Sequence, residues 1–328
     1  MKKQHYIKKI NIKNFKCFDD FKAEGFSRVN LIGGKNNVGK TAFMEACFID
    51  VCAHDVKSFS TAIVSIKVMR ENINILEEVV AKKKRFDESV TGNLMELSNG
   101  IYIDSNKKKL SYKIEEHNGV KKYIFQLNDE KIKVNIKDFT YIHTKNDNIK
   151  FIDNFGLSNG EIISNYSNIQ KLDREEYLNI VLNNFDSAIK SFKIIDEKPQ
   201  CKIGEEYLEI SELGDGTRHL VSIVSALFSC QDGYLFIDEI DNGIHYTMLD
   251  EIWNIIFEAS KTLNVQVFAT THSKAMIDSF LNTSEYLNDK EISFVELGRD
   301  KNNEVKAIVM DAKRLKIELQ SGNEVRGW

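Results

Sequence analysis

The chain has 328 residues, of which 42% are hydrophobic and 29% are charged, so it is long enough for a large core in one two-lobed domain or in two domains. It contains no run of about 18 apolar residues and no apolar block at its N-terminus, so we expect no membrane span, no signal peptide and a cytoplasmic protein. Five cysteines without a C-x-x-C pair argue against a zinc site or a disulfide framework.

The net charge of −4 hides a difference between the two halves of the chain. Residues 1–150 carry 28 Lys and Arg against 19 Asp and Glu, whereas residues 151–328 carry 17 against 30. The basic side chains are dense at 82–85, 107–109 and 121–122. Such a region can contact a polyanion, or it can lie on solvated turns and helix ends, and the composition leaves both interpretations open.

In the first half, hydrophobic periodicity predicts helices and strands in a clear order. Residues 6–32 predict two strands, and "TAFMEACFIDVC" at 41–52 predicts a helix. Residues 60–88 show helical spacing. From 100 to 143 the period changes to two, which predicts a meander of antiparallel strands.

In the second half, residues 170–195 predict a helix, residues 206–210 a strand, and "RHLVSIVSALFSC" a long apolar helix. "YLFID" and "VQVFATT" predict buried strands, each followed by a helix. A hairpin and a helix over 311–320 close the chain. The single proline, Pro199, and the lack of a low-complexity segment argue against a hinge between separate domains.

The segment "GKNNVGKT" fits the pattern G-x-x-x-x-G-K-[ST], with a predicted strand before it and a predicted helix after it. Glycines let backbone N–H groups turn toward an anion, and the helix N-terminus adds its positive dipole end. The pattern predicts a nucleotide site in which Lys40 reaches the β- and γ-phosphates and Thr41 ligates Mg²⁺. No N-K-x-D motif follows, which disfavours GTP. The predicted nucleotide-binding residues are Gly34, Lys35, Asn36, Asn37, Val38, Gly39, Lys40 and Thr41.

Two further strand ends carry groups suited to phosphate chemistry. "YLFIDEID" ends in carboxylates, and there Asp238 is predicted to hold magnesium while Glu239 orients and deprotonates the attacking water. "VQVFATTHS" places His272 after the next strand, where a neutral imidazole can hydrogen-bond a γ-phosphate.

A second anion-binding helix start is predicted in "SELGDGTRHL", where two glycines around an acid precede an apolar helix. Residues 34–41 already form a complete phosphate cradle. A second cradle makes sense if it serves the nucleotide of another copy, although an ordinary glycine-rich helix entry explains it too. Its residues are Gly214, Asp215, Gly216 and Thr217.

Together these motifs resemble the ABC-type ATPase heads of the SMC, RecF and OLD (overcoming lysogenization defect) proteins. The resemblance covers nearly the whole chain and is strongest in "NFKCF", "GKNNVGKT", "LGDGTRHL", "LFIDEIDNGIH" and "VFATTHS". It implies an α/β P-loop NTPase fold with a mixed central sheet, an antiparallel β meander and a short helical insertion. The implied single two-lobed domain, 1–328, divides into a P-loop strand-turn-helix (1–55), a helical insertion (56–99), a β subdomain (100–145), a helical lobe with the signature motif (146–230), and the Walker B strand, switch histidine and final hairpin and helix (231–328).

The resemblance also implies a homodimer or higher oligomer that sandwiches two ATP molecules. Lys40, Glu239 and His272 are then catalytic, Thr41 and Asp238 hold Mg²⁺, and residues 214–217 approach the partner's ATP. Gly214 replaces a serine common in ABC proteins, and His245 stands where they carry an aspartate, which disfavours a transporter subunit. The Toprim nuclease segment of OLD nucleases is missing, so a nuclease or toxin-like effector has to be a separate protein.

Three functions remain open at this stage. The first is an ATP-hydrolysing switch that controls a separate effector, plausibly in antiviral (anti-phage) defence, a role that rests on analogy alone. The second is a DNA-binding repair or recombination ATPase of the RecF/SMC type that uses the basic 82–122 region. The third and least supported is a nuclease in its own right.

Overall fold

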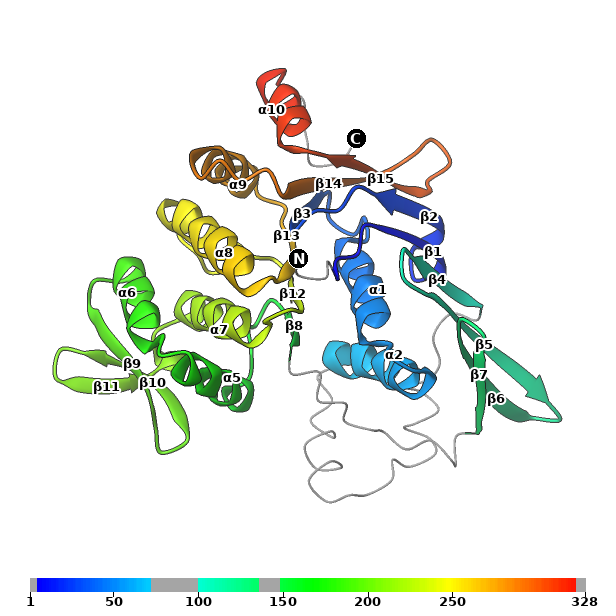
Figure 1. Cartoon of the computed structure of the whole chain (residues 1–328), viewed down its shortest axis with the longest axis horizontal. Coiled ribbons are helices and arrows are strands. Elements are labelled where there is room, and N and C mark those ends of the chain that lie inside the picture. The colour runs from blue at the N-terminus through cyan, green and yellow to red at the C-terminus, as the bar shows by residue number, and fades with distance from the viewer. Residues whose placement is uncertain (1–4, 72–99, 136–147, 323–328) are drawn as a thin grey trace.

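The computed structural model describes residues 5–71, 100–135 and 148–322, and it is built around a six-stranded central sheet (Figure 1). The strand order is β15-β14-β3-β13-β12-β8. All neighbouring pairs are parallel except β14 and β15. The carboxyl ends of β3, β13, β12 and β8 therefore meet at one edge. The strands are β3 (Val29–Gly34), β8 (Ile149–Ile152), β12 (Tyr234–Ile237), β13 (Gln266–Thr270), β14 (Ile292–Arg299) and β15 (Val305–Met310).

Helices cover both faces of this sheet, so its central strands are short apolar runs without polar alternation (Figure 1). One face is covered by α1 (Lys40–Cys52) and α2 (Val56–Glu71), and the other by α7 (Asp215–Ser229), α8 (Leu249–Leu263) and α9 (Lys274–Tyr286). Each face has its own cluster of buried side chains. In the described residues, no helix is long and apolar enough to cross a membrane.

A second six-stranded sheet, in the order β2-β1-β4-β5-β6-β7, packs beside α1 and α2 (Figure 1). The predicted meander is confirmed over 100–135, and the rest of that prediction lies outside the described residues. The strands are β1 (Lys9–Phe15), β2 (Phe18–Glu24), β4 (Ile101–Ser105), β5 (Lys109–His117), β6 (Val120–Leu127) and β7 (Glu130–Asn135).

The helical pattern predicted over 170–195 is confirmed at 175–185 and is wrong at 189–195. Two helices, α5 (Asn159–Lys171) and α6 (Glu175–Phe185), are followed by the small sheet β9 (Ile189–Ile195), β10 (Lys198–Ile203) and β11 (Glu206–Glu209). A capping box at Ser158 begins α5. "IKSFKII" forms a strand because its pairing with β10 buries Ile189 and Phe192 on one face.

Two short strands were also missed. Three strands rather than two form within residues 6–34, because Phe18 and Phe21 on β2 are buried against α1. The four-residue β8 gives almost no periodic signal. The predicted helix over 60–88 is described only as far as Glu71, and most of the 56–99 insertion lies outside the described residues.

The C-terminal prediction is confirmed. The hairpin β14–β15 is followed by α10 (Ala312–Gln320), where the Asp311 side chain accepts a hydrogen bond from Arg314 N. The helix predicted after "YLFID" begins at Leu249. It follows the 3₁₀ turn Tyr246–Met248, and a similar turn, Ile210–Glu212, precedes α7.

Candidate active site

The loop between β3 and α1 requires glycine at two positions. Gly39 has φ +111°, and a Cβ there would lie 2.5 Å from Cys17 Sγ. At Gly34 a Cβ would lie 2.7 Å from the Leu297 carbonyl oxygen and 2.8 Å from Val38 Cγ1. These contacts leave no room for a side chain at either position, so only the backbone of the loop lies there.

The N-terminus of α1 suits an anion. Its N-cap, Gly39, provides no side-chain hydrogen bond, and the first turn holds no acidic residue. The first backbone N–H groups therefore lack the side-chain partner that many helices supply. Residues 35–37 are exposed, so this end of the helix is accessible to a phosphate.

Lys40 lies against this loop and within the field of three carboxylates. Its Nζ donates hydrogen bonds to the carbonyl oxygens of Gly34 (3.0 Å) and Lys35 (3.1 Å). Burial lowers the pKa of Lys40, and the charges of Asp238, Glu239 and Asp241 oppose that shift. The fold therefore brings the lysine of one sequence motif beside the acids of another, about 200 residues later.

Hydrogen bonds join the start of α1 to the residues at the ends of β12 and β13. Asp238 Oδ1 accepts hydrogen bonds from Thr41 Oγ1 (3.1 Å) and from Thr270 Oγ1 (2.6 Å). A hydroxyl and a carboxylate are ligands that suit Mg²⁺, which takes few protein ligands and completes its shell with water and phosphate. In the described part of the chain, no cluster of three or more His, Cys, Asp or Glu residues offers a fuller metal cage.

Glu239 has a backbone conformation that is uncommon for its residue type. Its φ is +52°, and this geometry is fixed on both sides because Glu239 N donates to Thr270 Oγ1 (2.9 Å) and Asn242 N donates to Glu239 O (2.8 Å). Non-glycine residues held in this region concentrate at functional sites. Thr270 therefore orients both acids of the motif.

His272 lies two residues beyond the end of β13, with an exposed ring, immediately before the Ser273 N-cap of α9. Its neighbour Thr271 donates to Asp241 Oδ1 (2.7 Å). The histidine is thus at the same sheet edge as Lys40 and Asp238.

The predicted second cradle lies elsewhere. Gly214 and Asp215 are exposed, and α7 begins at Gly214 (φ +92°) without a side-chain cap. A Cβ at Gly216 would overlap the Gly243 carbonyl oxygen and would also meet Phe185. The nearest neighbours of Gly216 thus come from the loop after β12 and from α6, not from residues 34–41 in the same chain.

Gly216→Ala is expected to lower the free energy of unfolding by about 1–3 kcal/mol, the usual cost of overpacking, because the new methyl group meets Gly243 backbone. Denaturant or thermal unfolding measures this change in the free energy of unfolding. Gly160→Ala is the matched control, since a Cβ there meets nothing within 4 Å and alanine favours the helix. A wild-type midpoint for Gly216→Ala would contradict the close contact between Gly216 and Gly243.

Asp153 is a candidate residue that the sequence analysis missed. It follows β8, whose Ile152 is in register with Ile237, and Ile152 O accepts the N–H of Asp238 (2.8 Å). Burial raises the pKa of Asp153, and the charges of Glu161 and Asp238 add to the increase. The sequence did contain a signal for Asp153, since "FIDN" repeats the pattern of "FIDE", in which an acid follows an apolar strand.

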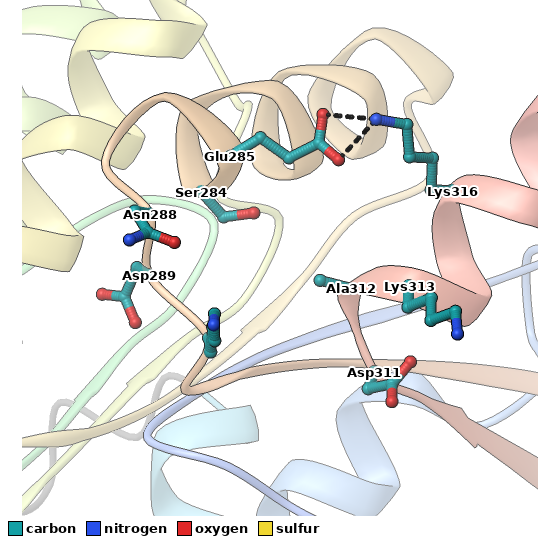
Figure 2. Close-up of a pocket in the computed structure, with 9 residues that line it drawn as sticks. Ser284, Glu285, Asn288, Asp289, Asp311, Ala312, Lys313 and Lys316 are labelled. Atoms are coloured by element: carbon teal, nitrogen blue, oxygen red, sulfur yellow. Dashed lines mark hydrogen bonds and ion pairs between the residues drawn. The ribbon is translucent and has the colours of Figure 1, made fainter.

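A cavity of about 460 Å³ lies away from these loops, between the end of α9 and the start of α10 (Figure 2). Asn288, Asp289 and Lys290 precede β14, so the cavity is at the amino edge of the sheet, opposite the predicted site. Its carboxylates are engaged: Glu285 pairs with Lys316, and Asp289 pairs with the buried Arg28. We assign it no part in the site.

Two lysines of the basic region have structural partners. Lys107 Nζ donates to Tyr234 Oη (3.2 Å), and Lys108 Nζ donates to Ala53 O (2.7 Å). Burial lowers the pKa of both. Residues 82–85 lie outside the described residues, so the predicted DNA contact is untested there.

Comparison with known proteins finds relatives of the whole chain and of its fold. The chain is 24% identical to an "ATP/GTP phosphatase" of Helicobacter pylori (strain ATCC 700392 / 26695) in an alignment that covers 83% of this chain and 86% of the relative. Its fold resembles that of an Smc head bound to the C-terminal winged-helix domain of ScpA, with TM-score 0.51, 15% identity and coverage of 93% and 98% of the two chains. An Smc head with an extended coiled coil, bound to the C-terminal domain of ScpA derived from Pyrococcus furiosus, gives TM-score 0.51, 12% identity and coverage of 96% and 99%.

These structures establish the fold, an α/β P-loop ATPase head with mixed sheets, as the sequence predicted. A family model described as "AAA domain, putative AbiEii toxin, Type IV TA system" matches residues 102–278. The matched segment contains the helix start at 214–217, the Asp238–Glu239 strand end and His272, and the predicted phosphate-binding loop at 34–41 precedes it. Because the family model matches more than half of the chain, this protein belongs to that AAA-domain family and is an ATPase.

Proposed function

We propose that this ATPase is a nucleotide-dependent switch: two copies close around two ATP molecules, separate after hydrolysis, and thereby regulate a separate effector protein. The observation that carries the proposal is that the chain has two uncapped helix starts with different neighbours. Residues 34–41 lie beside Asp238, whereas the exposed start of α7 packs on Gly243 and Phe185. The phosphate that the start of α7 would contact then belongs to ATP bound at residues 34–41 of a second copy of the chain.

Within one copy, each residue has a proposed role. The backbone of residues 34–39 and the Lys40 ammonium bind the phosphates of ATP, and Thr41 with Asp238 hold Mg²⁺, which supplies positive charge at the transferred phosphoryl group. Glu239, oriented by Thr270, accepts the proton of the attacking water. His272 contacts the terminal phosphate, and Asp153 stands beside the magnesium ligands.

The regulatory role rests on indirect support. The family description names a toxin of a toxin–antitoxin system, and the SMC-type fold occurs in proteins that bind a partner such as ScpA. An OLD-like role in anti-phage defence fits both, with a nuclease or toxin-like effector encoded separately. DNA binding through the basic region is the alternative, and it predicts an affinity that falls steeply with salt.

Light scattering tests the switch. With ATP and Mg²⁺, Glu239→Gln is expected to double its molar mass, because the carboxamide binds nucleotide but cannot accept a proton, so the closed pair persists. With ADP it stays monomeric. Lys40→Ala, which loses the phosphate contact, is the control and stays monomeric with either nucleotide. A Glu239→Gln protein that binds ATP without any change of mass would refute the proposed dimer.

A further inference from the structure

A buried histidine in α7 has poorly satisfied ring nitrogens. His219 is 2% exposed, neither ring nitrogen meets a partner at good hydrogen-bond geometry, and the polar group that interacts with the ring is the Ile240 backbone. The groups that face it are the backbone of Ile240 and the carboxylate of Asp241, both in the loop after β12. Burying a polar ring without well-formed hydrogen bonds costs folding free energy, so such a group calls for a specific explanation.

The ring is neutral at physiological pH. Burial lowers the pKa of His219 to about 4, even though Asp241 and the Ile240 backbone favour the charged form. A neutral imidazole carries one N–H donor and one acceptor nitrogen. The donor therefore needs an oxygen, and the acceptors beside the ring are the Ile240 backbone, which lies at poor geometry, and the Asp241 carboxylate.

Asp241 connects this position to the predicted catalytic loops. Its Oδ1 accepts the hydroxyl of Thr271 (2.7 Å), which leaves Oδ2 for a second donor. Thr271 stands between Thr270, which bonds Asp238, and His272. Ile240 N also donates to Thr270 O (3.0 Å). Hydrogen bonds from the adjacent residues Thr270 and Thr271 therefore connect Asp238 with Asp241.

The start of α7 contacts the loop after β12 and the loop after β8. Gly216 packs on Gly243, Arg218 Nη2 donates to Leu157 O (2.7 Å), and Asn242 Nδ2 donates to Asn154 O (2.6 Å). The exposed start of α7, the loop after β12 and the loop after β8 therefore form one junction. His219 lies inside it.

We propose that His219 is a positioning residue whose ring N–H donates to Asp241 when nucleotide is bound, which fixes the start of α7 relative to the loops that hold ATP. The inference rests on the proposed function of Thr41 and Asp238. Thr41 Oγ1 donates to Asp238 Oδ1 in this structure, and that contact would change if the two groups held Mg²⁺. The bond between His219 and Asp241 is not made here, so the proposal requires a second arrangement that nucleotide favours.

His219→Leu tests this, because leucine removes both poorly satisfied nitrogens while keeping an apolar side chain of similar size. The nucleotide-free variant is expected to unfold at the wild-type temperature or above. Its stabilisation by a non-hydrolysable ATP analogue with Mg²⁺ is expected to shrink, and kcat to fall about tenfold, the kinetic equivalent of one hydrogen bond, at a nearly unchanged KM.

Three further variants separate positioning from packing. His219→Gln, which keeps a donor, is expected to restore most of the turnover. Asp241→Asn added to His219→Leu is expected to cause little further loss, because the pair acts together. Ser225→Ala is the control: Ser225 is buried in the same helix, and its hydroxyl donates to Ser222 O of that helix (3.2 Å).

Two results would overturn the proposal: wild-type turnover and wild-type nucleotide stabilisation in His219→Leu, or a loss of turnover that merely follows a lower unfolding temperature without nucleotide. Either leaves the proposed ATPase site intact if Lys40→Ala is inactive. A wild-type protein that gains no thermal stability from nucleotide would overturn both.

Discussion

Lys40→Ala is expected to lower ATP turnover by at least about 100-fold, the usual cost of losing one preorganised group that stabilises transition-state charge. The lysine ammonium lies over the loop at 34–35 and within the field of Asp238 and Glu239, so it is the cation placed to neutralise the phosphates. Phosphate release at saturating ATP and titration with a fluorescent nucleotide measure turnover and affinity separately. Turnover and ATP affinity are both expected to fall, because Lys40 contacts ATP before and during the reaction.

Lys57→Ala is the matched control for this variant. Lys57 is an exposed lysine at the start of α2, outside the predicted site, so its loss removes the same charge from the molecule. Its turnover is expected to stay close to wild type. Comparable activity in Lys40→Ala and Lys57→Ala would show that residues 34–41 do not bind the reacting phosphates.

Glu239→Gln is expected to reduce kcat by about 10²–10⁴-fold, the range that general acid–base catalysis contributes, while ATP affinity is retained. The change replaces one carboxylate oxygen with an amide and leaves the backbone contacts of Glu239 with Thr270 and Asn242 in place. Single-turnover hydrolysis and equilibrium binding are the measurements. A loss confined to kcat identifies a group that acts in the transition state rather than in ATP binding.

Glu258→Gln, on the exposed surface of α8, controls for the loss of one negative charge and is expected to behave as wild type. Equal rates in wild type and Glu239→Gln would remove Glu239 as the base. Asp153, beside Asp238 in the register of the sheet, would then be the next carboxylate to replace.

Short-range sequence patterns were sufficient to predict the strands and loops that carry most of the candidate site. The run "VNLIGGKNNVGKT" specifies a buried strand, a glycine turn and a helix start, and the structure confirms each. "YLFIDE" and "VQVFATTHS" likewise end buried strands in polar residues, and parallel pairing brings their ends together. The roles assigned to Lys40, Asp238, Glu239 and His272 remain predictions. Over residues 189–195, periodicity failed, because pairing with β10 decided between helix and strand.

The sequence by itself determined the family of the fold, the glycine-dependent loop and the acids at strand ends, because these depend on local periodicity and on residue types that suit only a few conformations. Only the tertiary structure decided which strands are neighbours, and with that the place of Asp153 beside Asp238, the contact of Gly216 with Gly243, and the burial of His219 with poorly satisfied ring nitrogens. Those features depend on packing between segments tens to hundreds of residues apart, and local pattern carries no information about such contacts.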